Sequence, residues 1–346
     1  MPELDLASDD RSPADRVSVT VHLDPTDWSD HLAAETARGL SDAPPWIPPV
    51  WFYDEVGSKL FDQITRLAEY YPTEAERAIL AAHATDIARI TSATRVIELG
   101  SGTSDKTMLL LDALATHGSL RVVVPFDVSE AVLRSAARTI AATYPDVRVD
   151  AVVGDFGRHL DRVSTGDATL LAFLGSTIGN LDPVQRGSFL DGAARALQPG
   201  DWFLLGTDLV KPVDRLFAAY DDSSGVTAEF NLNALDVMNR ELGGDFYRER
   251  FTHRAHWDPE HERIEMHLVS TVDQVVTLDG LVAPGDSDAT NGLTLRLRAG
   301  EHLRTEISTK FHASGVAAEL VDAGFEPTAA WTDPAGDFLL TLALRP

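Results

Sequence analysis

The chain has 346 residues, 44% of them hydrophobic, which is enough for one large domain or two joined domains with a sizeable core. Its 54 acidic and 29 basic residues give a formal charge of −25, which disfavours nucleic acid and anionic membranes as partners. It has no cysteine, which excludes disulfides, thiolate nucleophiles and cysteine-ligated metals.

The N-terminal segment, residues 1–18, is polar and acidic, unlike a secretory signal, and we expect a disordered tail. No apolar run approaches the length needed to cross a bilayer. We therefore expect a cytoplasmic protein, monomeric, with no nucleic-acid or membrane partner.

Three helices are predicted before the first strand. Residues 26–40 carry apolar side chains at helical spacing, and the four prolines of "SDAPPWIPPVW" then interrupt the helix. Two more helices are expected near 54–67 and 73–91.

From residue 94 to 212, short apolar strands alternate with helices, which predicts βαβ units, right-handed crossovers and a parallel sheet. The expected strands are 94–99, 120–128, 147–156, 168–175 and 201–209, and the expected helices are 105–117, 129–144 and 183–198.

The pattern changes after residue 212. A helix at 227–242 and alternating strands at 262–270 and 301–311 indicate an α+β segment with antiparallel strands. A further helix and two strands then return the chain to the sheet. We predict an α/β fold in which residues 19–212 and 310–346 form a Rossmann-like domain, and 213–309 form an inserted substrate-binding domain that caps the cleft.

Three acids, Glu98, Asp127 and Asp155, end successive predicted strands and lie 29 and 28 residues apart. One βαβ unit takes roughly 30 residues, so the three carboxylates should lie at the same carboxyl edge of the sheet, where ligands bind in open α/β sheets. Any one of them could be a merely solvated strand end. Three in register beside a glycine loop indicate a binding site.

The loop "ELGSGTSDKT" places Gly100 and Gly102 directly after the first strand of the alternation, where they allow a tight turn and close approach of a ligand. A dinucleotide site would need a third glycine where Asp105 stands, which disfavours NAD. S-adenosylmethionine (SAM) carries no phosphate and fits better.

The chemistry of the predicted sheet edge matches the groups of SAM. Glu98 suits a cationic group, Asp127 can accept both ribose hydroxyls, and Asp155 can accept from the adenine amine. Phe156 can cover the adenine ring, and Lys106 can pair with the methionine carboxylate.

The motif "ELGSGTS" resembles the first motif of class I SAM-dependent methyltransferases, with Ser104 in place of the third glycine. Longer stretches, including "PPVWFYDEVGSKLFDQITRLAEYYPTEAE", "FLGSTIGNL" and "WTDPAGDF", resemble the ergothioneine-pathway histidine Nα-methyltransferases, from about residue 30 to the end. The resemblance implies a class I methyltransferase sheet, SAM as methyl donor, and trimethylation of the α-amino group of L-histidine to hercynine.

The resemblance also implies roles for individual residues. SAM contacts are expected from Tyr53, Gly100, Lys106, Asp127, Asp155 and Phe156, with Tyr53 also the candidate catalytic residue that orients the amine. The histidine carboxylate is expected to meet Tyr70, Asn180 and Tyr220. The imidazole is expected to meet Glu306 and Ser308, near Thr177 and Met266.

The residues alone leave these roles open. Glu306 and Ser308 lie two apart on a predicted strand, so they share a face and could serve both ring nitrogens, but they could also form a solvated polar face. Asn180 could belong to an ordinary loop, while the tyrosines and Met266 could simply be packing residues.

Other functions have less support. Four histidines lie within 253–267, but strand alternation scatters them and H-E-x-x-H is absent, so we expect no metal. A methyltransferase acting on another amino acid such as tryptophan, or a non-catalytic SAM-binding module, remain the alternatives.

Overall fold

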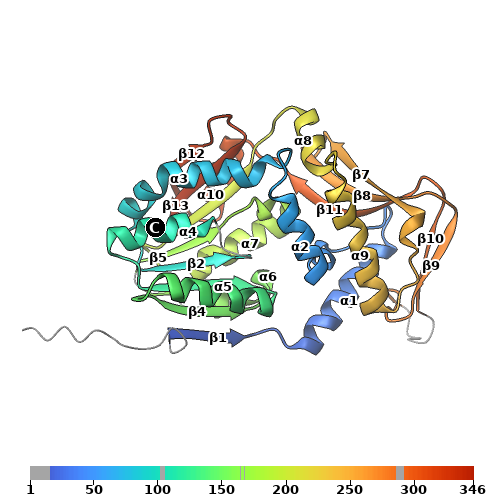
Figure 1. Ribbon diagram of the computed structural model, residues 1–346, viewed down its shortest axis with the longest axis horizontal. Helices are drawn as coiled ribbons and strands as arrows, with labels where there is room; N and C mark the ends of the chain where they lie inside the picture. The colour runs from blue at the N-terminus through green and yellow to red at the C-terminus, as the bar shows by residue number, and fades with distance from the viewer. Residues whose placement is uncertain (1–15, 102–105, 164, 167, 286–291) are drawn as a thin grey trace, which may run out of the picture.

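The computed structural model describes residues 16–101, 106–163, 165–166, 168–285 and 292–346, and within them one large sheet carries helices on both faces (Figure 1). The strand order of this sheet is β1-β4-β3-β2-β5-β6-β13-β12. In chain order its strands are β1 (Val17–Val21), β2 (Arg95–Leu99), β3 (Val122–Asp127), β4 (Arg148–Val153), β5 (Thr169–Phe173), β6 (Trp202–Asp208), β12 (Glu326–Thr332) and β13 (Phe338–Leu344).

Strands β1 to β6 pair in parallel, and β13 pairs antiparallel with β6. The α/β fold and its parallel strands are confirmed. Strand β1 was not predicted: Val17 and Ser18, assigned to the tail, pair with Val149 and Asp150 of β4. The alternating, mostly β-branched run VSVTV was the available signal for this strand. Residues 1–15 lie outside the described part of the chain.

Alternating side chains of each central strand face opposite layers of helices. Val96 and Val123 pack with helices α3, α4 and α5, whereas Ile97 and Val124 pack with α7 and α10. These helices are α3 (Tyr71–Thr91), α4 (Thr107–His117), α5 (Glu130–Thr143), α7 (Pro183–Ala196) and α10 (Ala313–Asp322). The doubly covered sheet leaves its carboxyl edge free for the loops that follow each strand.

The segment after β6 builds a second body beside that edge, at the right of Figure 1. It contains two helices, a three-stranded antiparallel sheet in the order β11-β8-β7, and a two-stranded sheet of β9 and β10. Its elements are α8 (Val213–Tyr220), α9 (Val226–Leu242), β7 (Phe251–Asp258), β8 (Arg263–Ser270), β9 (Gln274–Leu278), β10 (Leu293–Leu297) and β11 (His302–Thr309).

This second body, which we call the lid, also takes in the N-terminal helices. Side chains of α1 (Pro25–Ser41), the 3-10 helix η2 (Pro49–Phe52) and α2 (Glu55–Ile64) share one hydrophobic core with α8, α9 and the lid strands. The rings of Phe52 and Phe230 have centroids 4.6 Å apart in this core. The predicted division, with residues 19–212 all in the sheet domain, therefore differs from the packing. Helical periodicity shows which face of a helix is buried but not what covers it.

Within the described residues, no helix is long and apolar enough to cross a membrane. No cluster of three or more His, Cys, Asp or Glu side chains in that part of the chain is placed to hold a metal ion.

Candidate active site

A cleft of about 1780 Å³ lies between the carboxyl edge of the sheet and the lid. Ligand pockets usually measure roughly 300–1,000 Å³, so this cleft has room for two small molecules side by side. Its wall contains most of the residues expected to form the site: Tyr53, Tyr70, Glu98, Gly100, Lys106, Asp127, Asp155, Phe156, Thr177, Asn180 and Glu306.

The three acids of the sheet edge meet as predicted, because β2, β3 and β4 are adjacent parallel strands. Glu98 is only 5% exposed and accepts a hydrogen bond from the Thr107 hydroxyl, so its carboxylate also secures the start of α4. Asp127 Oδ1 accepts from the Ser129 backbone nitrogen at 2.9 Å, and Asp155 occupies the N-cap position of the short helix after β4, where its carboxylate makes no capping hydrogen bond.

The turn after β2 brings bare backbone to this edge. Gly100 has a φ of +65°, in the left-handed region that favours glycine, and its nitrogen donates to Phe126 O at 2.8 Å. A Cβ added there would meet no atom of the described chain within 4 Å, and Gly100 lines the cleft. Gly102, Ser104 and Asp105 lie outside the described residues.

Phe156 lines the cleft beside Asp155 and is held by other aromatic rings. Its ring centroid lies 5.2 Å from that of Phe173 and 5.6 Å from that of Phe189, both edge-on. The flat apolar ring of Phe156 beside the Asp155 carboxylate suits adenine. The three carboxylates, the turn at Gly100 and Lys106 together fit SAM.

Lys106 has a protein partner that the sequence analysis missed. Its ammonium pairs with Glu76 of α3, a carboxylate with no exposed surface, which also accepts from the Gly175 nitrogen at 2.9 and 3.0 Å. Glu76 lies on the buried face of α3 with Ile79 and Leu80, and an acid on an apolar helix face was the available signal. Glu76 thus fixes Lys106 and the loop after β5 relative to each other.

Tyr53 and Tyr70 form the lid side of the cleft. Both rings pack against Phe61, with centroids 5.7 and 6.3 Å away, and 38% of the Tyr53 surface stays exposed toward the cleft. Burial within the surrounding protein, followed by nearby charge that includes Glu306, raises the pKa of both hydroxyls. Both phenols therefore remain protonated and can donate hydrogen bonds.

Glu306 of β11 lies opposite the sheet edge. Asn180, from the 3-10 helix η4 (Thr177–Asn180), donates to Glu306 Oε1 at 3.2 Å. Burial raises the pKa of Glu306 to about 7, although Lys310 and Asn180 oppose this rise. Helix η4 packs closely on β11 at Gly179. A Cβ added to Gly179 would lie only 2.8 Å from Thr309 O.

Three of the expected substrate residues are buried in the lid next to this wall. The Tyr220 hydroxyl donates to Ser308 Oγ at 2.9 Å, and both side chains are less than a tenth exposed. Met266 is the cross-strand neighbour of Glu306 and belongs to the lid core. Tyr70, Thr177, Asn180 and Glu306 therefore line the cleft, whereas Tyr220, Met266 and Ser308 lie behind its Glu306 wall rather than in its lining.

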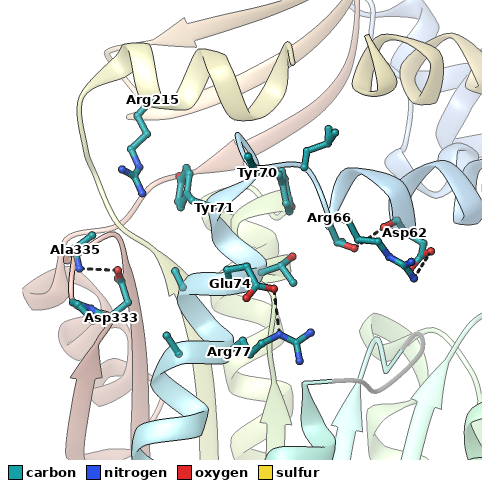
Figure 2. Close-up of a pocket in the computed structure, with 16 residues that line it drawn as sticks. Asp62, Arg66, Tyr70, Tyr71, Glu74, Arg77, Arg215, Asp333 and Ala335 are labelled. Carbon is teal, nitrogen blue, oxygen red and sulfur yellow. Dashed lines mark hydrogen bonds and ion pairs between the residues drawn. The ribbon is translucent and has the colours of Figure 1, made fainter. Parts of the chain in front are cut away.

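A second pocket, of about 650 Å³, lies beside Tyr70 and Tyr71 (Figure 2). Three arginines line it, but each is paired with a carboxylate: Arg66 with Asp62, Arg77 with Glu74, and Arg215 with Asp337. Because these charges are already balanced, we assign the pocket no ligand.

Comparison with known proteins identifies the group to which this cleft belongs. The sequence profile of the SAM-dependent, histidine-specific methyltransferases matches residues 32–345. The chain belongs to this family. The class I methyltransferase fold, the SAM cofactor and enzymatic methyl transfer predicted from the sequence are thereby confirmed.

Among its relatives in this methyltransferase family, the histidine N-alpha-methyltransferase of Mycolicibacterium smegmatis is 50% identical over 314 residues, covering 91% of this chain and 95% of that protein. The histidine N-alpha-methyltransferase of Mycobacterium tuberculosis is 49% identical over 330 residues, covering 95% of this chain and 100% of that protein. Ergothioneine biosynthesis protein 1 of Neurospora crassa is 31% identical over 301 residues, covering 84% of this chain and 32% of that protein.

Proposed function

We propose that this methyltransferase adds three methyl groups to the α-amino nitrogen of L-histidine and forms hercynine, the first step of ergothioneine biosynthesis. The observation that carries the proposal is the partly buried Glu306 carboxylate, which accepts from Asn180 on the wall that faces the SAM edge of the sheet. A carboxylate on that wall can accept from an N–H group of a ligand, and the imidazole of histidine has one.

SAM, when bound, supplies a methyl group that its sulfonium already activates, so no metal is needed. We assign Gly100, Asp127, Asp155 and Phe156 to binding the adenosine of SAM. We assign Lys106 to binding the methionine carboxylate of SAM. Lys106 can serve Glu76 and a ligand carboxylate at once, because an ammonium has three donors.

Residues of the lid and of η4 contact the two ends of the amino acid in this proposal. We assign Tyr70, Asn180 and Tyr220 to the histidine carboxylate, and Glu306 and Ser308 to its ring, with Thr177 and Met266 alongside. Contacts at both ends leave the nitrogen between them free to turn, which three successive transfers require. Catalysis then consists mainly of aligning the nitrogen with the methyl group.

Tyr53 lies where it can orient the amine. The raised pKa of its hydroxyl disfavours a phenolate, so we assign the Tyr53 oxygen the role of accepting a hydrogen bond from the amine N–H, which leaves the nitrogen lone pair free, rather than the role of an ionised base. The proton of the attacking amine then leaves through water in the open part of the cleft.

Mass spectrometry of histidine incubated with SAM and the protein tests the proposal. Three added methyl groups are expected on histidine and none on tryptophan; turnover of tryptophan alone would establish the alternative substrate. Glu306→Ala should raise KM for histidine sharply and leave SAM affinity nearly intact. Glu326→Ala, at an exposed carboxylate at the start of β12, is the matched control. Equal loss of SAM binding in Glu306→Ala would contradict the imidazole assignment.

We also expect the enzyme to act as a monomer in the cytoplasm. Sedimentation of the purified protein with SAM and histidine tests the first point.

A further inference from the structure

Lys310 is a buried lysine directly behind the proposed substrate site. Only 2% of the residue is exposed, and it follows Glu306 and Ser308 at the same two-residue spacing, directly after the end of β11. Its ammonium contacts three oxygens: Asp208 Oδ2 at 2.9 Å, the Tyr220 hydroxyl at 3.0 Å and Ser308 Oγ at 2.8 Å. An ammonium has three hydrogens, so these contacts use all of its donors.

Asp208 supplies the negative charge that keeps Lys310 in place. It is 1% exposed and also accepts from Tyr71 at 2.7 Å and from the ammonium of Lys211. Burial alone would raise the pKa of Asp208, but the charges of Lys310 and Lys211 lower it, so its carboxylate stays ionised. Asp208 and Lys310 form a fixed ion pair at the junction of the sheet and the lid.

The direction of the hydrogen bonds follows from the chemistry of lysine. An ammonium has no lone pair, so the Tyr220 and Ser308 oxygens must both accept from Lys310, and neither hydroxyl hydrogen can point at it. The same ammonium contacts Asp208, so the Asp208 carboxylate accepts from Lys310 while both hydroxyl oxygens do so as well. In the protein without ligand, one hydroxyl hydrogen bridges the two oxygens, 2.9 Å apart.

We propose that Lys310 is a positioning residue that keeps the hydroxyl hydrogens of Tyr220 and Ser308 available to the substrate. When the substrate enters, both oxygens stay satisfied as acceptors, and their hydrogens turn to it. The Ser308 hydroxyl then donates to an unprotonated nitrogen of the substrate imidazole, while Glu306 accepts from the N–H of the other ring nitrogen. The site therefore selects a neutral imidazole. This inference rests on the proposed histidine methyltransferase function.

Lys310→Met tests the proposal, because it removes all three donors and keeps an unbranched side chain. Calorimetry with S-adenosylhomocysteine present should show histidine binding weakened roughly tenfold or more, the scale of a lost hydrogen bond to a buried group, with SAM affinity within twofold of wild type. Lys211→Met is the matched control. Lys211 also binds Asp208, but its other contacts are Tyr71 and Leu209 O, so histidine affinity should change less than about threefold.

A double variant separates positioning from mere structural support. If Lys310 acts through Ser308 and Tyr220, then Lys310→Met should cost much less histidine affinity when Ser308→Ala is already present. A full and additive loss would overturn the proposal, as would wild-type histidine affinity in Lys310→Met or an equal loss in Lys211→Met.

Should Lys310→Met fail to fold, Lys310→Gln replaces it. Its amide retains two N–H donors for the same two oxygens, so histidine should bind more tightly than to Ser308→Ala; equal or weaker binding refutes the proposal. Failure of the function itself is distinguishable, because the wild-type protein would then neither bind nor methylate histidine.

Discussion

Glu306→Gln should stabilise this protein at alkaline pH while impairing its proposed activity. Glutamine keeps the size of the side chain and an oxygen that can still accept from Asn180, but it carries no charge to bury. Glu306 has an ordinary pKa of 4.5 that burial raises to about 7, so the folded protein holds this proton more tightly than the unfolded chain does.

The sign of the pH dependence follows from proton counting. Below about pH 4.5 the carboxyl is protonated in both states, and it costs no stability. Between about pH 4.5 and 7 the unfolded chain binds fewer protons than the folded protein, so wild-type stability falls as pH rises. At roughly 1.36 kcal/mol per pH unit, the full difference is about 3 kcal/mol, an upper bound because water in the cleft also reaches the carboxylate.

Denaturant unfolding of the wild type and Glu306→Gln at pH 4.5 and pH 8 measures this effect. The variant should gain up to about 3 kcal/mol at pH 8 and almost nothing at pH 4.5. Glu326→Gln, at an exposed position, should gain almost nothing at either pH. A gain that is equal at both pH values, or a loss at pH 8, would show that burial of the Glu306 charge is not the cause.

Three further predictions concern SAM and the loop after β5. Asp127→Ala should weaken SAM binding roughly tenfold to a hundredfold by calorimetry, since charged hydrogen bonds to ribose are lost; unchanged affinity would remove the ribose assignment. Glu76→Gln leaves Lys106 without its buried counterion, so the melting temperature of the variant protein should fall. SAM should raise the melting temperature of the variant by more than that of the wild type, and an equal rise would contradict this pairing. Gly179→Ala puts a Cβ 2.8 Å from Thr309 O, so KM for histidine should rise severalfold with SAM affinity unchanged. Gly187→Ala, in open space on α7, should instead leave both constants alone, and equal effects would refute the close-packing argument.

The sequence by itself determined the central parallel strands of the sheet and their carboxyl edge. Strand and helix periods are local, and right-handed crossovers of similar length bring Glu98, Asp127 and Asp155 to one side whatever the lid does. The longer stretches at 48–76, 173–181 and 331–338 were specific enough to indicate the family. The two-residue spacing of Glu306 and Ser308 also continues to Lys310, a step that the sequence reasoning did not take.

Only the tertiary structure decided which charges are paired and which elements build the lid. Glu76 lies within α3 while Lys106 precedes α4, and Asp208 ends β6 while Lys310 follows β11, so no local pattern connects either pair. The packing of α2 and η2 against α9 is equally nonlocal. The sequence does not distinguish a buried charged side chain from an exposed one, because the role of the side chain depends on a partner that only folding brings close to it.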